Sequence, residues 1–394
     1  VMVTLLIKVS HLNEPVEKAG LANLTAELLT EGTKNRTSSE ISEEIEFIGA
    51  TLDVNVLNDY TTISLSVLKK DIQKGFELFS DILLNPVFPE EELERKKGLI
   101  KGIIRQWEED PSFLAEHAFK KEVFGDFPYG RLIEGSIDTL DAIKRDDIIS
   151  FYKSYFLPNN SILSVAGDLT EEELSFIIDR YLKNWEKSIL PPVIEHKIDV
   201  RRSKKTVKID KDLTQANIIL GHIGISRSNP DYYAISIMNY ILGGGGFSSR
   251  LMQKIREEKG LAYDVNSAFI SNKESGLFQV EVQTKNETAN AVISEILNQL
   301  KNIRQNLVSD MELSEAKSYL TGSFLRKLDT TREIADFFAF VEFHNLGLDY
   351  VDKYSTYINS ITKEDILKVA QKYLDIENYI LVVVADQEKA SIKY

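Results

Sequence analysis

The sequence predicts an α+β protein made of two homologous domains, each a mainly antiparallel sheet packed with helices. Two observations lead to this fold class. Segments of the first half of the chain recur in the second half, in the same order and at a nearly constant separation. In addition, the predicted strands and helices are grouped rather than regularly alternating, which favours an α+β arrangement over a doubly wound parallel sheet.

The duplication is clearest where a helix leads into a strand. Ile143-Lys-Arg-Asp-Asp147 matches Ile361-Thr-Lys-Glu-Asp365, 218 residues later. Each opens an amphipathic helix, and an apolar strand follows in both copies, at 162–166 and 380–384. Further pairs keep the same order: Gly49 with Gly260, Asp53 with Asp264, Lys97 with Lys317, and Gly102 with Gly322. Ordered matches over the whole chain indicate two copies of one domain.

The boundary between the copies is expected near Leu190-Pro191-Pro192, which stops the preceding helix and is followed by a charged stretch. We therefore predict an N-terminal domain over 1–187, a linker over 188–202 and a C-terminal domain over 203–394. Apolar periodicity predicts helices at 21–29, 39–47, 72–84, 89–106 and 145–156. Strands are predicted at 51–58, 61–68, 161–166, 215–221, 261–269 and 276–283, the first two with the strict alternation of half-buried antiparallel strands.

Composition narrows the function. The 394 residues are 43% hydrophobic and 27% charged, which is typical of a soluble globular protein. A net charge of −14 argues against nucleic acid as the main partner, and no apolar run approaches the ~20 residues of a membrane span. The chain has no cysteine, and no two of its five histidines have the spacing of a local metal site. The first residues, Val1–Val9, read as a strand, so the sequence is expected to be a processed product from which any targeting segment has been removed. We expect a soluble protein of the cytoplasm or the periplasm.

One stretch carries a family resemblance. Residues 20–33 read GLANLTAELLTEGT. They resemble the zinc peptidase family of pitrilysin, insulysin and the mitochondrial processing peptidase, which reads Gly-Leu-Ala-His-x-x-Glu-His-x-x-x-x-Gly-Thr here. In that family the two histidines bind zinc and the glutamate activates water. This chain has Asn23, Ala26 and Glu27 at those positions. The family's third zinc ligand, a glutamate, is expected at 101–104, where this chain reads Lys-Gly-Ile-Ile and has no acidic residue. The resemblance therefore implies a degenerate motif and no metal bound by this chain.

Other parts of the family pattern are intact. Residues 45–50 precede an alternating strand that resembles the family's substrate-side edge strand, so Thr51, Leu52, Asp53 and Val54 are candidate substrate contacts. The run Gly243-Gly244-Gly245-Gly246 reads either as a helix-terminating loop or as a loop that contacts substrate. Beyond it lie Arg256 and Tyr263, seven residues apart. By resemblance, Tyr263 would donate to the oxyanion of the tetrahedral intermediate, and Arg256 would hold the substrate backbone. The alternative for Arg256 is an ordinary basic residue at a helix C-terminus.

A chain without zinc ligands that keeps this arginine and tyrosine resembles the non-zinc subunit of the family's bacterial two-subunit branch. The resemblance implies a chain that is inactive alone and contributes Arg256 and Tyr263 to the zinc site of a catalytic paralogue bearing His-x-x-Glu-His. Unfolded or short peptides would be the substrates, and a chamber wall would be part of its contribution. The alternative function is a catalytically retired structural or peptide-binding homologue, in which both residues are relics.

Overall fold

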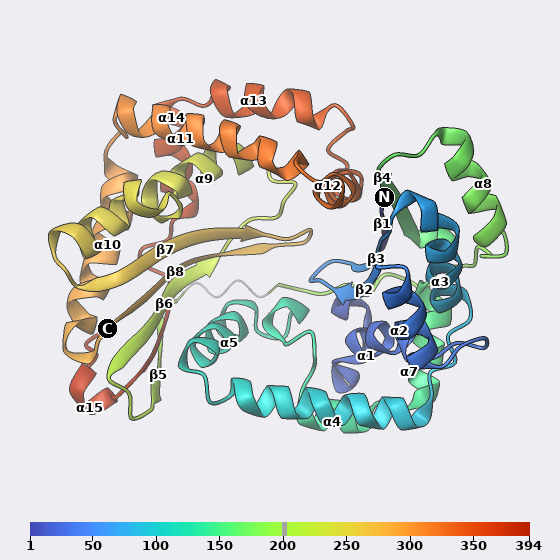
Figure 1. The fold of residues 1–394 in the computed structure, drawn as a ribbon. Helices are drawn as coiled ribbons and strands as arrows, with labels where there is room; N and C mark the ends of the chain where they lie inside the picture. The colour runs from blue at the N-terminus through green and yellow to red at the C-terminus, as the bar shows by residue number, and fades with distance from the viewer. Residues whose placement is uncertain (199–202) are drawn as a thin grey trace. The chain divides into compact units, whose positions relative to one another are not determined.

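The computed structural model describes residues 1–198 and 203–394, and within them the chain forms two compact units (Figure 1). The first unit consists of Val1–Gln106, Arg131–His196 and Arg326–Leu348. The second consists of Trp107–Gly130, Lys197–Leu325 and Asp349–Tyr394. Residues 199–202, at the end of the predicted linker, lie outside the described residues.

The first unit is built on a four-stranded antiparallel sheet in the order β2-β3-β1-β4. Its strands are β1 (Met2–Ile7), β2 (Thr51–Val56), β3 (Thr61–Ser66) and β4 (Ser161–Ala166). The unit's helices are α1 (Leu21–Glu27), α2 (Ser38–Phe47), α3 (Ile72–Leu84), α4 (Glu90–Trp107), α6 (Ile137–Ala142), α7 (Arg145–Tyr155), α8 (Glu171–Tyr181) and α12 (Thr331–Phe343).

The second unit contains a five-stranded sheet in the order β5-β9-β6-β8-β7, antiparallel except for the β5–β9 pair. The strands are β5 (Lys205–Asp210), β6 (Gln215–Ile223), β7 (Ala262–Ser271), β8 (Gly276–Lys285) and β9 (Ile380–Ala385). The helices are α5 (Pro111–Phe124), α9 (Tyr232–Asn239), α10 (Ala289–Gln305), α11 (Asp310–Phe324), α13 (Tyr350–Ser360), α14 (Lys363–Tyr373) and α15 (Gln387–Ala390). Two further segments, η7 (Tyr240–Gly244) and η9 (Met252–Glu258), are π-helical.

The predicted duplication is present in the structure. The helix–strand pair α7–β4 of the first unit corresponds to α14–β9 of the second, at the separation seen in the sequence. The edge strands β2 and β7 correspond in the same way, as do α4 and α11. The predicted fold class, two homologous α+β domains with mainly antiparallel sheets, is therefore confirmed.

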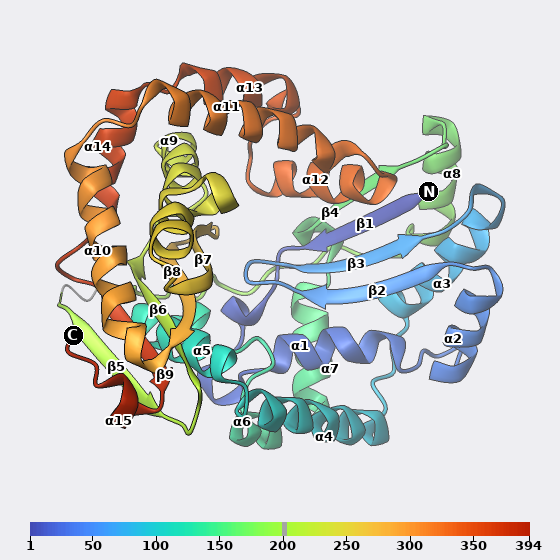
Figure 2. The same ribbon diagram turned by 60° about the vertical axis from the view of Figure 1, so that its left-hand side comes forward.

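Each sheet is covered on one face by a helix from the other half of the sequence. In the first unit α12 packs on β1 and β4 (Figure 2). At this contact Leu6 forms a buried cluster with Ala339 and Phe343. In the second unit α5 packs on β6 and β9. Gly221 of β6 leaves room for two neighbours, because a Cβ there would lie 1.9 Å from the carbonyl oxygen of Phe278 on β8 and 2.8 Å from the Cζ of Phe119 on α5. The compact units are thus discontinuous in sequence.

Among the described residues, no helix has both the length and the apolar character needed to cross a bilayer.

Candidate functional site

The degenerate zinc motif lies on α1, whose start is fixed by a buried carboxylate. Gly20 precedes the helix with a φ of 99°, a left-handed conformation that glycine adopts without strain. Glu14 is 2% exposed, and its carboxylate accepts hydrogen bonds from the backbone N–H groups of Gly20 at 2.9 Å and Ala22 at 2.8 Å. Burial raises the pKa of Glu14 to about 7, an effect that the two N–H donors offset only in part.

The three motif positions on α1 lie in a network of hydrogen bonds and ion pairs. Asn23 donates from Nδ2 to Oε1 of Glu27 at 3.1 Å, while Ala26 is buried. The ammonium group of Lys96, on α4, lies 3.3 Å from Oε2 of Glu27 and 3.0 Å from Oε1 of Glu31. A lysine cation therefore neutralises the carboxylate at the second histidine position of the family motif.

Glu31 is held by further partners. Arg95 donates to its Oε2 at 3.0 Å, and Ser38 donates from Oγ to the same oxygen at 3.0 Å. Burial alone would raise the pKa of Glu31, but the hydrogen bond and charge of Lys96 outweigh it and the pKa is lowered. This carboxylate is thus already paired with two cations of the chain itself.

This donor set does not fit zinc. Zinc sites in proteins use imidazole, thiolate and carboxylate donors, usually four-coordinate, and a catalytic site supplies three from the protein. Around α1 the motif offers an amide, a methyl group and a carboxylate that Lys96 already engages. In the described parts of the chain, no cluster of three or more histidine or acidic side chains has the arrangement to hold a metal ion.

The predicted substrate strand β2 lies at the edge of the first sheet, and among the described residues it pairs only with β3. Its exposure alternates, with Thr51 and Asp53 exposed and Leu52 and Val54 half-buried. Arg332, on α12, lies 3.4 Å from Oγ1 of Thr51 and 3.5 Å from Oδ2 of Asp53. The backbone N–H and C=O groups of β2 on the side away from β3 have no strand partner in the described part of the chain, so they can hydrogen-bond an added strand.

In the second unit the structure brings Arg256 and Tyr263 together. Arg256 comes from η9 and Tyr263 from the edge strand β7. The guanidinium carbon of Arg256 lies 4.5 Å from the centre of the Tyr263 ring. Tyr263 is 81% exposed, far more than its neighbour Ala262, which is buried. Tyr263 is exposed and Arg256, with a side chain 25% exposed, is half-buried beneath it, so the two residues form one group of hydrogen-bond donors at the surface.

A β-bulge explains why Tyr263 points outward. Ala262 pairs with Thr284, but the next paired residue is Val265, opposite Val282, so β7 has one more residue than β8 between these pairs. A bulge of this kind bends the strand and re-aims its side chains. Both residues of the bulge, Tyr263 and Asp264, are exposed in consequence.

The run of four glycines, Gly243–Gly246, packs against β7 at its first residue. A Cβ on Gly243 would lie 2.5 Å from Oγ and 2.7 Å from N of Ser267, a contact that no other residue could make without displacement. Asn239 reinforces the same contact, donating to the carbonyl of Ser267 at 3.0 Å and accepting from its Oγ at 2.8 Å. Gly243 is buried, whereas Gly244 and Gly246 are exposed, so only the end of the run is available to a ligand.

Two residues near these sites were not singled out by the sequence reasoning. Phe247 follows the glycines, and its ring centre lies 4.7 Å from the guanidinium carbon of Arg256. An aromatic residue directly after a glycine run was the available signal. Lys96 pairs with the motif on α1, but it lies on another helix far along the sequence, and no local pattern indicates that contact.

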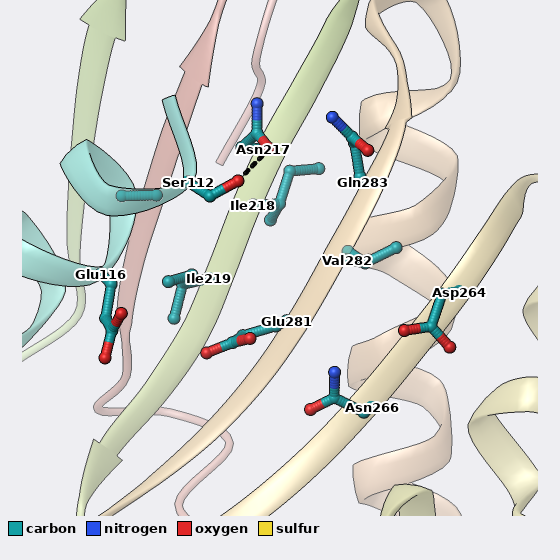
Figure 3. Close-up of a pocket in the computed structure, with 11 residues that line it drawn as sticks. Ser112, Glu116, Asn217, Ile218, Ile219, Asp264, Asn266, Glu281, Val282 and Gln283 are labelled. Atoms are coloured by element: carbon teal, nitrogen blue, oxygen red, sulfur yellow. Dashed lines mark hydrogen bonds between the residues drawn. The ribbon is translucent and has the colours of Figure 1, made fainter. Parts of the chain in front are cut away.

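A hollow of about 250 Å³ lies on the second sheet, between α5 and strands β6, β7 and β8 (Figure 3). Its carboxylates are Glu116, Asp264 and Glu281. Burial raises the pKa of Glu281, and the negative charge of Glu116 raises it further. Ser112 and Asn217 close one end through a hydrogen bond of 3.2 Å. The hollow is therefore lined by acidic side chains beside the edge strand β7. Among the described residues no histidine lines it, so it does not offer the donor set of a zinc site.

The fold and the α1 region define a class: a duplicated α+β chain with the architecture of a zinc peptidase and without its metal donors. Residues 1–136 match the sequence model described as Insulinase (Peptidase family M16), and residues 142–320 match that described as Peptidase M16 inactive domain. An uncharacterized zinc protease of Rickettsia bellii is 30% identical over 326 residues, which are 81% of this chain and 76% of that protein. The chain belongs to peptidase family M16.

Further relatives agree with this assignment. An uncharacterized zinc protease of Streptomyces coelicolor is 28% identical over 363 residues, covering 90% of this chain and 78% of that protein. Among solved structures, a peptidase M16 inactive domain from Pseudomonas fluorescens superposes with a TM-score of 0.90 at 25% identity, covering 98% of this chain and 92% of that one. A protease from Helicobacter pylori shares the fold, with a TM-score of 0.90 at 21% identity, covering 97% of this chain and 94% of that one.

Proposed function

We propose that this chain is the non-zinc subunit of a heteromeric zinc endopeptidase, and that it supplies Arg256 and Tyr263 to the active site of a partner. The observation that carries the proposal is the contrast between the two sites. The zinc-motif helix lacks the metal donors and holds an internal ion pair in their place, whereas Arg256 and the exposed Tyr263 remain in contact with each other. A side chain retained only for folding would not need to be 81% exposed.

The two residues have complementary chemistry. The phenol of Tyr263 is a neutral donor, suited to an oxyanion that develops during attack on a peptide carbonyl. The guanidinium of Arg256 is always charged and has several N–H donors, suited to main-chain carbonyls of the substrate. Preorganised donors of this kind act in the transition state without reorganisation, because the protein has already fixed their positions.

Peptide binding would use the parts of the chain that remain open. A substrate strand would add to the unpaired side of β2 along Thr51–Val54, with main-chain hydrogen bonds providing most of the affinity. The exposed end of the glycine run, Gly244–Gly246, allows a second backbone to approach closely. Both features favour unfolded or short peptides, because a folded protein does not present a free strand.

The first test is purification of the native complex, with mass spectrometry of co-eluting chains and zinc analysis. We expect a stoichiometric paralogue bearing His-x-x-Glu-His and about one zinc per pair. The second test is Tyr263→Phe in that complex, assayed on quenched-fluorescent casein. Loss of one oxyanion donor should lower kcat roughly 100-fold without loss of zinc. Tyr319→Phe, at another exposed tyrosine of the second unit, is the matched control and should retain activity.

The competing function is a retired structural or peptide-binding protein. It is favoured by the self-contained network on α1, which needs no metal. It predicts a metal-free chain, alone or as a homodimer, in which Arg256→Ala and Tyr263→Phe leave peptide binding unchanged. Full turnover of the complex with Tyr263→Phe would refute the catalytic role assigned to this residue.

A further inference from the structure

Phe247 is an exposed aromatic residue that the packing of the second unit does not account for. Its side chain is 64% exposed, whereas the phenylalanines of the core are almost fully buried. It lies in the short turn η8 (Gly246–Ser248), which Gly246 enters with a φ of 57°. A single exposed aromatic residue is common on protein surfaces, so what marks Phe247 is the contact that its ring makes with Arg256.

The turn holds Phe247 firmly. Ser249 is fully buried and donates from Oγ to the carbonyl of Gly246 at 2.7 Å, and Ser248 donates from Oγ to the carbonyl of Gly245 at 2.9 Å. Upstream, the contact between Gly243 and Ser267 joins the same segment to β7. Hydrogen bonds within the turn thus hold the backbone around Phe247, and the segment before it is joined to the strand that carries Tyr263.

The ring of Phe247 contacts the guanidinium of Arg256. The Arg256 guanidinium carbon lies 4.7 Å from the Phe247 ring centre and 4.5 Å from the Tyr263 ring centre. A cation is attracted to the face of an aromatic ring, and arginine makes this contact more often than lysine. Two such contacts restrict the guanidinium to one position without using its N–H donors, which lie in its plane.

The donors of Arg256 are available in the structure. Among the described residues, its one ion-pair partner is the adjacent Glu257, with Nε and Oε1 3.5 Å apart, and its guanidinium donates no hydrogen bond to another of these residues. Without the two rings, this neighbouring carboxylate would compete for the guanidinium and draw it away from Tyr263. The contacts with the rings oppose that pairing.

We propose that Phe247 is a positioning residue, which holds the Arg256 guanidinium beside Tyr263 with its N–H donors directed to a bound peptide. The inference rests on the function proposed above, because it assigns Arg256 to substrate binding. Phe247 would thus act together with Arg256 and Tyr263. Its aromatic ring face is what this role requires, and the polarity of the side chain is not. Tyrosine or tryptophan should therefore replace it, and leucine of similar size should not.

The experiment uses four variants of the full chain: Phe247→Ala, Phe247→Leu, Phe247→Trp and, as a control, Phe176→Ala, an exposed phenylalanine of α8 in the first unit. The first readout needs no partner. The side-chain signals of Arg256 in NMR spectra of arginine-labelled protein, assigned with Arg256→Lys, should show upfield ring-current shifts. Phe247→Ala and Phe247→Leu should reduce these shifts, while Phe247→Trp and Phe176→Ala should retain them.

The second readout is turnover of quenched-fluorescent casein by the native complex. Phe247→Ala and Phe247→Leu should lower kcat/KM about tenfold, mainly through KM, and Phe247→Trp should restore it. Unchanged Arg256 signals in Phe247→Ala would overturn the positioning role, and so would equal activity of the leucine and tryptophan variants. If Arg256→Ala and Tyr263→Phe leave turnover intact, the proposed function fails instead, and the NMR shifts still report whether Phe247 holds the arginine.

Discussion

Replacing Glu14 with glutamine should remove a pH dependence from the stability of the first unit. Glu14 is buried at the start of α1, and burial raises its pKa from 4.5 to about 7. Between about pH 4.5 and pH 7, the Glu14 carboxyl therefore keeps its proton in the native state but has released it in the unfolded chain. Glutamine keeps the shape and an acceptor oxygen but cannot ionise, so it serves as a permanent mimic of the protonated acid.

The sign and size follow from linkage. Because the folded pKa is raised, this stabilisation is fully present below pH 4.5 and is lost as the pH rises through about 7. A difference of about 2.5 pKa units corresponds to roughly 3.4 kcal/mol in the free energy of unfolding. Most of it, about 2.5 kcal/mol, should be lost between about pH 5 and pH 8. His117 and His222, whose pKa values burial lowers, contribute the opposite slope in the lower part of this interval, so only a comparison of variants isolates Glu14.

The assay is urea unfolding followed by tryptophan fluorescence. The chain has two tryptophans, and Trp185 lies in the first unit with its Nε1 donating to the carbonyl of Phe156 at 3.0 Å. In a Trp107→Phe background the fluorescence therefore reports the unit that contains Glu14. The measured quantity is the stability of the Glu14→Gln protein minus that of its parent at each pH. Glu17→Gln, at an exposed carboxylate three residues away, is the matched control.

The difference should grow in favour of glutamine as the pH rises, by about 2.5 kcal/mol over that interval. A difference that stays constant with pH would refute the reasoning, because it would mean that Glu14 ionises alike in the folded and unfolded chain. A difference of the opposite sign would show that the two N–H donors of α1 outweigh burial. The Glu17→Gln difference is subtracted at each pH, so that only the effect specific to the buried carboxylate remains.

Three further predictions concern other parts of the structure. Lys96→Met should lower the stability of the first unit by about 1–2 kcal/mol in urea unfolding, because Glu27 loses its cation and Glu31, which is partly buried, keeps only the cation of Arg95. Gly243→Ala should cost at least about 2 kcal/mol through its clash with Ser267, whereas Gly98→Ala, in an open position on α4, should stabilise by about 0.5–1 kcal/mol. Burial lowers the pKa of His222, so the stability of the second unit should fall as the pH drops below about 6.5. His222→Gln should reduce that fall and leave the part contributed by His117, whose pKa burial also lowers.

The fold was largely predictable because its signals are local or repeated. The helix at 72–84 and the strand at 161–166 have the predicted bounds, since apolar periodicity and turn residues define both ends. The strand predicted at 51–58 ends earlier, at Val56, because the following residues turn to join β3. The exchange of α5 and α12 could not be predicted, because an apolar helix face does not specify which sheet will cover it.

The site was predictable to a smaller extent. Sequence resemblance selected Arg256 and Tyr263, and the structure places them in contact. It gave no indication of the bulge that exposes Tyr263, because the extra residue is defined only against the partner strand. Phe247 and Lys96 contact residues of other helices or strands, and one sequence taken alone does not indicate which distant residues will be in contact.

The exchanged helices also impose an order on biosynthesis. The last strand of the first sheet, β4, is complete at residue 166, but the side chains that cover Met2 and Leu6 are Ala335, Ala339 and Phe343. Nearly half of the chain separates these points. At usual translation rates the ribosome needs roughly 10–35 s to make it. During this interval one apolar face of the nascent sheet stays uncovered, so we expect holdase chaperones to bind the growing chain there.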